Sequence, residues 1–350
     1  MRISWLAYGD LGQPTGGYVY DRLVVEALRA LGDDVRVEDP RDPAAVAGAL
    51  GADAVVGDGL CMRELGPLFE RVAGGRARVL LVHHLTSWEP EWIDRAAAAA
   101  DEARAIAASD RIVVTGARTA QRFVEEHGTL LRSRPDRDVV LVPPGADRLP
   151  RLPRRAGPPG RLGLLSLGSL IPRKRLPLVL DALEELARPE VTLSIIGDAS
   201  RDAHHARALA ARIAGSPLLR AAVRLEGVAD DDGVARALAS ADALVLASSL
   251  EGYGMVVAEA LHAGVPVIVS RAAAEAAGVE SSGPTLVFCD RPGLVDALRR
   301  MCDDPGLREA AREAALACKL PRWDETAAGF RAALRPAETA ARARGSGPSR

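Results

Sequence analysis

One stretch, residues 243–270, constrains this chain most, because it reads as strand, glycine turn and helix in direct succession. Residues 243–247 (ALVLA) are apolar, long enough for a buried strand and too short for a helix. Gly252 and Gly254 then permit a sharp turn, and residues 255–262 (MVVAEALH) have the apolar spacing of a helix. This order predicts one βα unit of a parallel sheet, in which ligands bind beyond the carboxyl ends of the strands.

Two carboxylates belong to this unit, Glu251 in the turn and Glu259 on the helix. The N–H groups of Gly254, Met255 and Val256, at the helix start, have no intrahelical acceptor and favour an anion. We therefore expect a phosphate ester there, with Glu251 accepting hydrogen bonds from nearby hydroxyls and Glu259 from a second pair, such as a ribose diol. The alternative is that both glutamates are ordinary solvated side chains.

The pattern Glu251-Gly-Tyr-Gly, followed by Glu259-Ala-Leu-His-Ala-Gly-Val-Pro-Val-Ile, closely resembles the paired-glutamate signature of the family-4 retaining glycosyltransferases. The resemblance implies the GT-B fold, an α/β architecture of two Rossmann-like, doubly wound parallel-sheet domains facing across a cleft. It also implies that Glu251 contacts hydroxyls of the donor sugar and that Glu259 binds the nucleotide ribose. The donor-binding residues implied around them are Gly252, Tyr253, Gly254, Met255 and Val256.

Chain length and strand spacing predict two domains. A chain of 350 residues exceeds one typical domain. Strand patterns alternate with helical patterns in both halves, which indicates parallel sheets covered on both faces. In the first half these strand patterns lie at 3–8, 35–37, 54–56, 79–83, 112–115 and 139–142.

The domain boundaries follow from composition and from the resemblance. We expect an N-terminal acceptor-binding domain at 1–147, a linker rich in Pro and Arg at 148–161, and a C-terminal nucleotide-sugar-binding domain at 162–321. The resemblance adds a helix at 322–336 that crosses back to the N-terminal domain. Residues 337–350 have no apolar side chain larger than those of alanine and proline to bury, and they are predicted to be disordered.

Composition argues against several functional classes. The 45 basic residues nearly balance the 47 acidic ones, so no strong field favours nucleic acid. The four cysteines form no Cys-x-x-Cys pair, which favours reduced thiols over disulfides or a zinc site. The chain start lacks the pattern of a secretory signal, and no apolar stretch approaches the roughly 20 residues that span a bilayer. We expect a soluble, cytoplasmic protein with at most peripheral membrane contact.

A glycine-rich turn at 9–17 (GDLGQPTGG) follows the first strand pattern. Its spacing differs from Gly-x-Gly-x-x-Gly, which disfavours dinucleotide binding. Gly16 and Gly17 instead resemble the family's glycine-rich loop, which approaches the donor phosphates. The alternative is a plain turn with two flexible residues.

Two histidines end the strand pattern at 79–83. A buried, hydrogen-bonded histidine is the ordinary interpretation, but the position matches the family's strand-end histidine, which faces donor sugar and acceptor. We assign that role to His83 and place His84, Trp88 and Trp92 at the acceptor, because aromatic rings often stack on sugars. Alternatively, the tryptophans only pack the next helix against the core.

Basic residues follow the strand pattern at 162–167. Arg173 and Lys174 lie where a strand-to-helix loop meets the predicted anion site, and cations there would neutralise a diphosphate leaving group. These two cations are not expected to stabilise the fold, since positive charges at a helix start oppose the helix dipole. By resemblance Lys174 grips the diphosphate, whereas Ser169 replaces an arginine common in the family; either Arg173 or Arg175 compensates, or the site is tuned differently.

The base and the metal requirement are the remaining predictions. Gly197, Asp198 and Val228 are expected to flank the base. Residues 230–232 (DDD) precede a helix, so capping explains them better than a metal site. The family implies no metal and no other cofactor, because the helix dipole and the cations stabilise the leaving group.

The implied activity is transfer of a hexose or amino-hexose from a nucleotide diphosphosugar, UDP first and GDP next, to a hydroxyl of a small-molecule, natural-product or lipid acceptor. The anomeric configuration is retained, and the leaving phosphate takes the acceptor proton on the same face. One alternative is a GT-B epimerase or hydrolase of nucleotide sugars, revealed by nucleotide release without acceptor. Another is a catalytically silent nucleotide-sugar-binding protein, which would bind without turnover.

Overall fold

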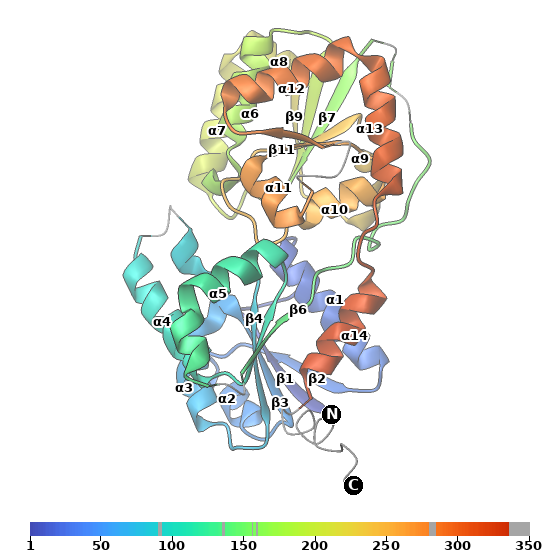
Figure 1. Cartoon of the computed structure of the whole chain (residues 1–350). Coiled ribbons are helices and arrows are strands. Elements are labelled where there is room, and N and C mark those ends of the chain that lie inside the picture. The colour runs from blue at the N-terminus through green and yellow to red at the C-terminus, as the bar shows by residue number, and fades with distance from the viewer. Residues whose placement is uncertain (90–92, 135–136, 156, 159, 280–284, 336–350) are drawn as a thin grey trace. The chain divides into compact units, whose positions relative to one another are not determined.

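The computed structural model describes residues 1–89, 93–134, 137–155, 157–158, 160–279 and 285–335. The chain divides into two compact units. Unit 1 comprises Met1–Gln13, Gly17–Pro144 and the segment from Asp324, and unit 2 comprises Pro14–Gly16 and Gly145–Trp323. Each unit contains one six-stranded sheet flanked by helices (Figure 1). The predicted disordered tail at 337–350 lies outside the described residues.

Unit 1 is built on a wholly parallel sheet in the order β2-β1-β3-β4-β5-β6. Its strands are β1 (Arg2–Leu6), β2 (Asp34–Glu38), β3 (Ala54–Asp58), β4 (Ala77–Val82), β5 (Arg111–Val114) and β6 (Asp138–Leu141). Each of the six strand patterns predicted for the first half therefore forms a strand. Its helices are α1 (Gly16–Ala30), α2 (Pro43–Ala49), α3 (Met62–Arg71), α4 (Arg95–Ala108), α5 (Ala117–Arg132) and α14 (Trp323–Ala333), with short turns η1 (Gly59–Cys61) and η2 (Thr86–Trp88).

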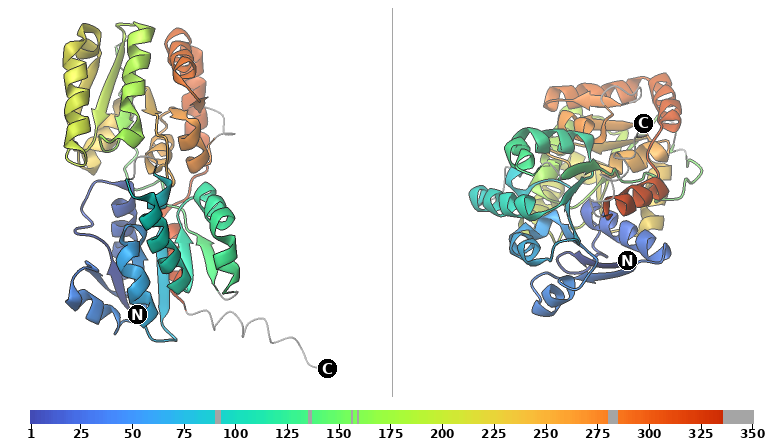
Figure 2. Two further views of the ribbon diagram at one scale, coloured as in Figure 1. Left: turned by 90° about the vertical axis from the view of Figure 1, so that its left-hand side faces the viewer. Right: turned by 60° about the horizontal axis from the view of Figure 1, so that its bottom comes forward.

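Helices cover both faces of the unit 1 sheet. Helices α1 and α14 pack on one face, and α3, α4 and α5 lie on the other (Figures 1 and 2). Phe330 of α14 is fully buried, with its ring centroid 5.1 Å from that of Trp5 and 6.4 Å from that of Tyr20. The last described helix thus completes the core of the N-terminal sheet.

Unit 2 repeats the parallel design in the order β12-β11-β10-β7-β8-β9. Its strands are β7 (Leu162–Leu167), β8 (Val191–Ile196), β9 (Val223–Gly227), β10 (Ala243–Leu246), β11 (Val267–Ser270) and β12 (Leu286–Phe288). Its helices are η3 (Pro172–Lys174), α6 (Leu176–Leu186), α7 (Ala203–Gly215), α8 (Pro217–Ala222), α9 (Asp231–Ser240), α10 (Met255–His262), α11 (Arg271–Ala277), α12 (Arg291–Asp303) and α13 (Pro305–Ala317).

Side chains of unit 2 alternate between two cores, one on each face of the sheet. Val245 of β10 packs into the core that contains residues of α6, α8 and α12. Its neighbours Leu244 and Leu246 pack into the core that contains residues of α9, α10 and α11. This alternation buries both faces, as the apolar run of β10 predicted. Among the described residues, no helix is long and apolar enough to cross a bilayer.

The loops after β7 and β8 approach each other closely at Gly168 and Gly197. A Cβ atom built on Gly197 would lie 1.8 Å from the carbonyl oxygen of Gly168, a distance that backbone movement alone could relieve. Gly168 has a φ of 136°, a conformation that residues with side chains rarely adopt. Both glycines are therefore required by the meeting of these two strand ends.

We predict that Gly197→Ala destabilises the protein by about 1 to 3 kcal/mol, because the added methyl group must displace the backbone of Gly168. Urea unfolding would measure the loss. Gly215→Ala is the matched control: Gly215 ends α7 with nothing within 4 Å of the position that a methyl group would take, so alanine should leave stability unchanged or slightly raised. Equal midpoints for Gly197→Ala and wild type would contradict the close approach.

Candidate functional site

The strand order of unit 2 reverses between β7 and β10, and such a reversal is where open α/β sheets bind ligands. The loop after β7 carries Arg173 and Lys174, and the loop after β10 carries Glu251. Lys174 Nζ donates to Glu251 Oε1 at 2.7 Å, although the two residues are 77 positions apart in sequence. The fold thus joins the predicted phosphate-binding cation to the first predicted carboxylate.

Arg173 holds the same two loops together through its backbone and its side chain. Its Nη1 atom donates to the carbonyl of Leu250 at 2.6 Å and lies 3.8 Å from Glu251 Oε2. Its own carbonyl accepts from the N–H of Ser249 at 2.9 Å. Arg175, next to this pair, has a φ of 50°, a strained conformation for a residue with a side chain and one that clusters at functional sites.

The electrostatics of this cluster favour an anionic ligand. Burial by itself would raise the pKa of Glu251, but Lys174 and Arg173 outweigh burial and lower the pKa to about 2. The side chains of Lys174 and Glu251 are only 14% and 10% exposed. Two cations thus face one ionised carboxylate, which leaves one formal positive charge in a weakly solvated place.

Helix α10 starts beside Glu251, as the sequence predicted. Gly254 precedes it with a φ of 79°, so the turn uses the conformation that glycine permits. The first N–H groups, including those of Met255 and Val256, have no acceptor inside the helix. Gly252 and Tyr253 form the turn between the carboxylate and this helix start.

Glu259 lies on α10 and is 3% exposed, but it does not stand alone. Its Oε1 atom accepts from Arg148 Nε at 3.0 Å, and Arg148 also pairs with Asp231. Burial raises the pKa of Glu259, although Arg148 acts in the opposite direction. Arg148 was not predicted to belong to the site, because it falls in the predicted linker at 148–161, yet its side chain is only 10% exposed.

The other predicted donor residues follow neighbouring strands of the same sheet. Ser169 and Gly197 follow β7 and β8, and Ser169 is buried at 8% exposure. Asp198 Oδ1 accepts from the N–H and the hydroxyl of Ser200, both at 2.7 Å. Val228 follows β9 and is 58% exposed. These residues share one edge of the sheet, because the carboxyl ends of parallel strands lie together.

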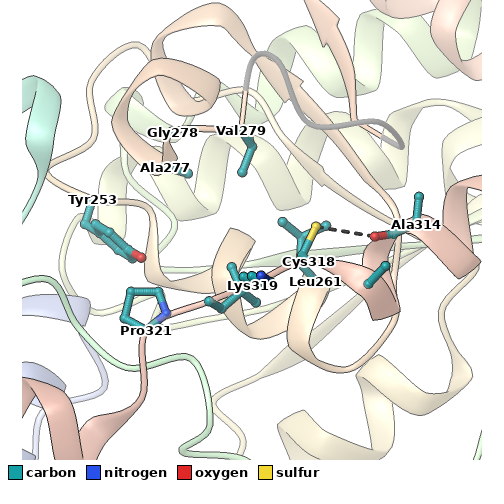
Figure 3. Close-up of a pocket in the computed structure, with 11 residues that line it drawn as sticks. Tyr253, Leu261, Ala277, Gly278, Val279, Ala314, Cys318, Lys319 and Pro321 are labelled. Atoms are coloured by element: carbon teal, nitrogen blue, oxygen red, sulfur yellow. Dashed lines mark hydrogen bonds between the residues drawn. The ribbon is translucent and has the colours of Figure 1, made fainter.

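Unit 2 also contains a cavity of about 480 Å³ next to the donor turn (Figure 3). Tyr253 projects toward its middle, and burial raises the pKa of that phenol to about 12. Its wall is mostly apolar and comes from α10, α11, α13 and the segment after α13: Leu261, Ala277, Gly278, Val279, Ala314, Ala317, Cys318, Lys319, Leu320 and Pro321. Tyr253 therefore adjoins an apolar space as well as the predicted donor turn.

In unit 1, His83 follows β4 and meets two carboxylates. Its Nε2 atom lies 3.1 Å from Asp21 Oδ1 on α1 and 3.5 Å from Asp58 Oδ2 at the end of β3. Asp21 Oδ2 also accepts from the indole of Trp5 at 3.1 Å. His83 was predicted from the sequence, but the two aspartates were not. The position of Asp58 at the end of a buried strand was the available signal.

The two aspartates hold His83 in its charged form. Burial lowers the pKa of His83, but the hydrogen bonds that its ring donates to Asp21 and Asp58 raise it to about 10. Burial and the charge of Asp58 raise the pKa of Asp21 to about 7, against the effect of His83. At neutral pH the expected form is thus an imidazolium beside an ionised Asp58, with Asp21 near the midpoint of its titration.

The same three side chains could also hold a metal ion, since one ligand atom from each lies within 4.8 Å of the others. A proton on His83 Nε2 explains the cluster equally well, because that nitrogen lies within 3.1 Å of Asp21 and 3.5 Å of Asp58. The acidic run at 230–232 has another explanation: Asp230 caps α9 by accepting from the N–H of Gly233 at 2.7 Å. The predicted capping role is therefore confirmed for Asp230.

Gly16 and Gly17 are the first two residues of α1. A Cβ atom on Gly17 would lie 3.1 Å from Cδ2 of His83, so a side chain there would press on the imidazole. Glycine at this position therefore allows close packing against the histidine.

The predicted acceptor residues have partners of their own. His84 Nε2 lies 2.6 Å from Glu89 Oε1. Trp88 is 6% exposed, its indole N–H donates to Glu126 at 2.6 Å, and the guanidinium of Arg122 covers the ring at 4.2 Å. This burial favours the packing alternative for Trp88 over stacking on a sugar. Trp92 lies outside the described residues.

We predict that Asp21→Asn lowers the pKa of His83 toward its ordinary value of about 6.5, because the amide removes a buried negative charge. In the wild type, the folded pKa of His83 exceeds the unfolded one. Its contribution to stability is therefore full below about pH 6.5 and is lost as the pH rises toward 10. Nuclear magnetic resonance titration of the imidazole would measure the shift. Asp53→Asn is the control, since Asp53 pairs with Arg2 on the surface; a wild-type His83 that titrates near 6.5 would contradict the prediction.

Comparison with known proteins identifies a matching family and similar solved structures. A family model described as "Family 4 Glycosyltransferase in conflict systems" matches residues 24–282. The search of curated proteins finds no match. Similar solved structures include sucrose-phosphate synthase from Thermosynechococcus elongatus, with a TM-score of 0.77 and 18% identity over 97% of this chain and 100% of that one.

Two further structures share the fold. HepE from Anabaena, in complex with UDP and glucose, has a TM-score of 0.76 and 15% identity over 95% of this chain and 99% of that one. WaaG, a glycosyltransferase involved in lipopolysaccharide biosynthesis, has a TM-score of 0.64 and 17% identity over 99% of this chain and 100% of that one. The two parallel sheets and their flanking helices form the GT-B fold. With the family model matched over most of its length, the chain belongs to the family-4 glycosyltransferases, in the group described from conflict systems.

Proposed function

We propose that this glycosyltransferase moves a hexose or amino-hexose from a nucleotide diphosphosugar to a hydroxyl group, with retention at the anomeric carbon and without a metal ion. UDP is the first candidate for the donor nucleotide and GDP the second. The acceptor is a small molecule, a natural product or a lipid with a free hydroxyl.

The observation that carries this proposal is the buried cluster of Arg173, Lys174 and Glu251. Its excess positive charge lies where the sheet of unit 2 reverses its strand order and where α10 begins. Fixed cations and free N–H groups together stabilise a diphosphate leaving group without reorganisation during the reaction. Glu251, ionised beside them, accepts hydrogen bonds from sugar hydroxyls.

The proposal gives His83 a role at the transferred sugar. As an imidazolium it donates a hydrogen bond from the end of β4, and the paired aspartates fix the ring. The leaving phosphate takes the proton from the acceptor hydroxyl, so no protein nucleophile is needed. The choice of UDP draws support from HepE, whose structures contain UDP, UDP with glucose, and UDP-glucose.

The deciding experiment measures sugar transfer from UDP- and GDP-sugars to a panel of hydroxyl acceptors, with metal-stripped protein and excess EDTA. We expect activity to persist in EDTA and to fall by a large factor in Glu251→Gln while nucleotide binding survives. Activity that is lost in EDTA and restored by Mn²⁺ would oppose the mechanism and point to Asp230–Asp232 or to the cluster of Asp21, Asp58 and His83.

Other outcomes separate the alternative functions. Nucleotide release without an acceptor indicates a hydrolase or an epimerase. Binding without either turnover or release indicates a silent binding protein. Equal loss of nucleotide affinity in Glu251→Gln and Glu259→Gln would show that the two glutamates do not have distinct roles.

We predict that Lys174→Ala weakens binding of the nucleoside diphosphate about tenfold or more, and of the nucleoside much less, since one charge-assisted hydrogen bond contributes roughly 1.5 to 3 kcal/mol. Calorimetry with both ligands would measure the difference. The chain has only one other lysine, Lys319, which is exposed, so Lys319→Ala is a matched control. Unchanged diphosphate affinity in Lys174→Ala would remove the argument for a cationic clamp.

A further inference from the structure

The guanidinium of Arg148 lies between two carboxylates from different helices of unit 2. Its Nε and Nη2 atoms lie 3.0 and 2.9 Å from the same oxygen, Oε1 of Glu259 on α10. Its Nη1 atom donates to Asp231 at the start of α9. The side chains of Arg148 and Glu259 are 10% and 3% exposed, whereas that of Asp231 is 54% exposed. Arg148 is thus a buried bridge in the segment that leads into unit 2.

The charge of this bridge is opposite to that of the Lys174 cluster. One arginine faces two carboxylates, which leaves one formal negative charge. Such a group repels phosphate and accepts hydrogen bonds from hydroxyls. Because both contacts from Arg148 to Glu259 end on Oε1, and none from the described residues reaches Oε2, the second oxygen is the one placed to accept from a ligand.

The Lys174 cluster lies at the start of α10, and the Arg148 bridge contacts Glu259 further along the same helix. Gly254 precedes α10, and Glu259 is its fifth residue, so the two differ by roughly 7.5 Å along the axis at about 1.5 Å per residue. An anion site at the start and a hydroxyl acceptor further along match the order of groups in a nucleoside diphosphate: phosphates first, then ribose.

We propose that Arg148 is a positioning residue for nucleotide binding: it holds the Glu259 carboxylate by Oε1 and leaves Oε2 to accept a hydrogen bond from a ribose hydroxyl. This inference rests on the proposed function, which places a nucleotide along α10. The protonation of Glu259 supports it. Burial and the nearby charge of Asp231 raise the pKa of Glu259, and Arg148 is the cation that opposes them. Without Arg148 the carboxyl group takes up a proton more readily and becomes a poorer acceptor.

The test compares UDP with 2′-deoxy-UDP by calorimetry, or the corresponding guanine pair if the wild type prefers GDP. A single lost hydrogen bond should make the wild type favour the ribonucleotide by about tenfold. In Arg148→Met the preference should be well below that of the wild type at pH 6 and closer to it at pH 8.5, because a higher pH favours the ionised form of Glu259. Arg148→Lys should keep most of it, since it retains the charge.

Two controls separate positioning from general stability. Arg154→Met removes an arginine of the same segment that pairs with Asp242 and Glu309, and it should keep the wild-type preference. The double variant Arg148→Met with Glu259→Gln should show the same preference for the ribonucleotide as Glu259→Gln alone. The two changes act on the same hydrogen bond, so their effects should not add. If Arg148→Met keeps the wild-type preference at both pH values, the inference is wrong. If the wild type binds neither UDP nor GDP, the proposed function itself fails.

Discussion

The salt bridge between Lys174 and Glu251 is the interaction on which the candidate donor site of unit 2 depends. It joins the loops after β7 and β10 at the reversal of strand order, and both of its side chains are nearly buried. Removing Glu251 would leave two cations without their carboxylate, and removing Lys174 would leave Glu251 with Arg173 alone. Breaking a buried pair in this way costs more than the intact pair contributes. Glu251 therefore stays ionised only while Lys174 and Arg173 remain in place, so the carboxylate and the cations form one unit rather than three separate binding residues.

A second buried ionic cluster organises unit 1 by the opposite arrangement, with one cation between two carboxylates. His83 follows β4, Asp21 lies on α1 and Asp58 ends β3, so the cluster forms only when these three elements are packed together. Gly17 completes this arrangement, because a larger residue would press on the imidazole. In both units the polar groups gather at the carboxyl ends of parallel strands, where the backbone leaves the sheet and side chains can converge without breaking its hydrogen bonds.

Much of the fold and part of the site could be predicted from the sequence, and the difference has a physical reason. The unit around Glu251 and Glu259 is contiguous, so its strand, turn and helix are all visible in one stretch. Asp21 and His83 are 62 positions apart, and only the folded sheet brings them together. Arg148 was missed because proline and arginine indicate an exposed linker, whereas the adjoining Leu149 is buried at 5% exposure and carries Arg148 into the domain. Trp88 was ambiguous because aromatic residues near a sugar site and in a core look alike until burial is known.

In the proposed donor site, Ser169 stands where the family commonly has an arginine, so the cluster has one cation fewer. The serine is buried at 8% exposure, and the carbonyl of Asp198 accepts from the N–H of its neighbour Leu170 at 2.9 Å, so this loop is fixed by backbone bonds. Arg173 cannot simply replace a missing arginine, because its guanidinium already bonds the Leu250 carbonyl and faces Glu251. The cations first secure the ionisation of Glu251, and their single surplus charge is then available to the ligand. On the proposed function, stabilisation of a second phosphate charge comes mainly from the N–H groups at the start of α10, where the helix dipole acts in the same direction.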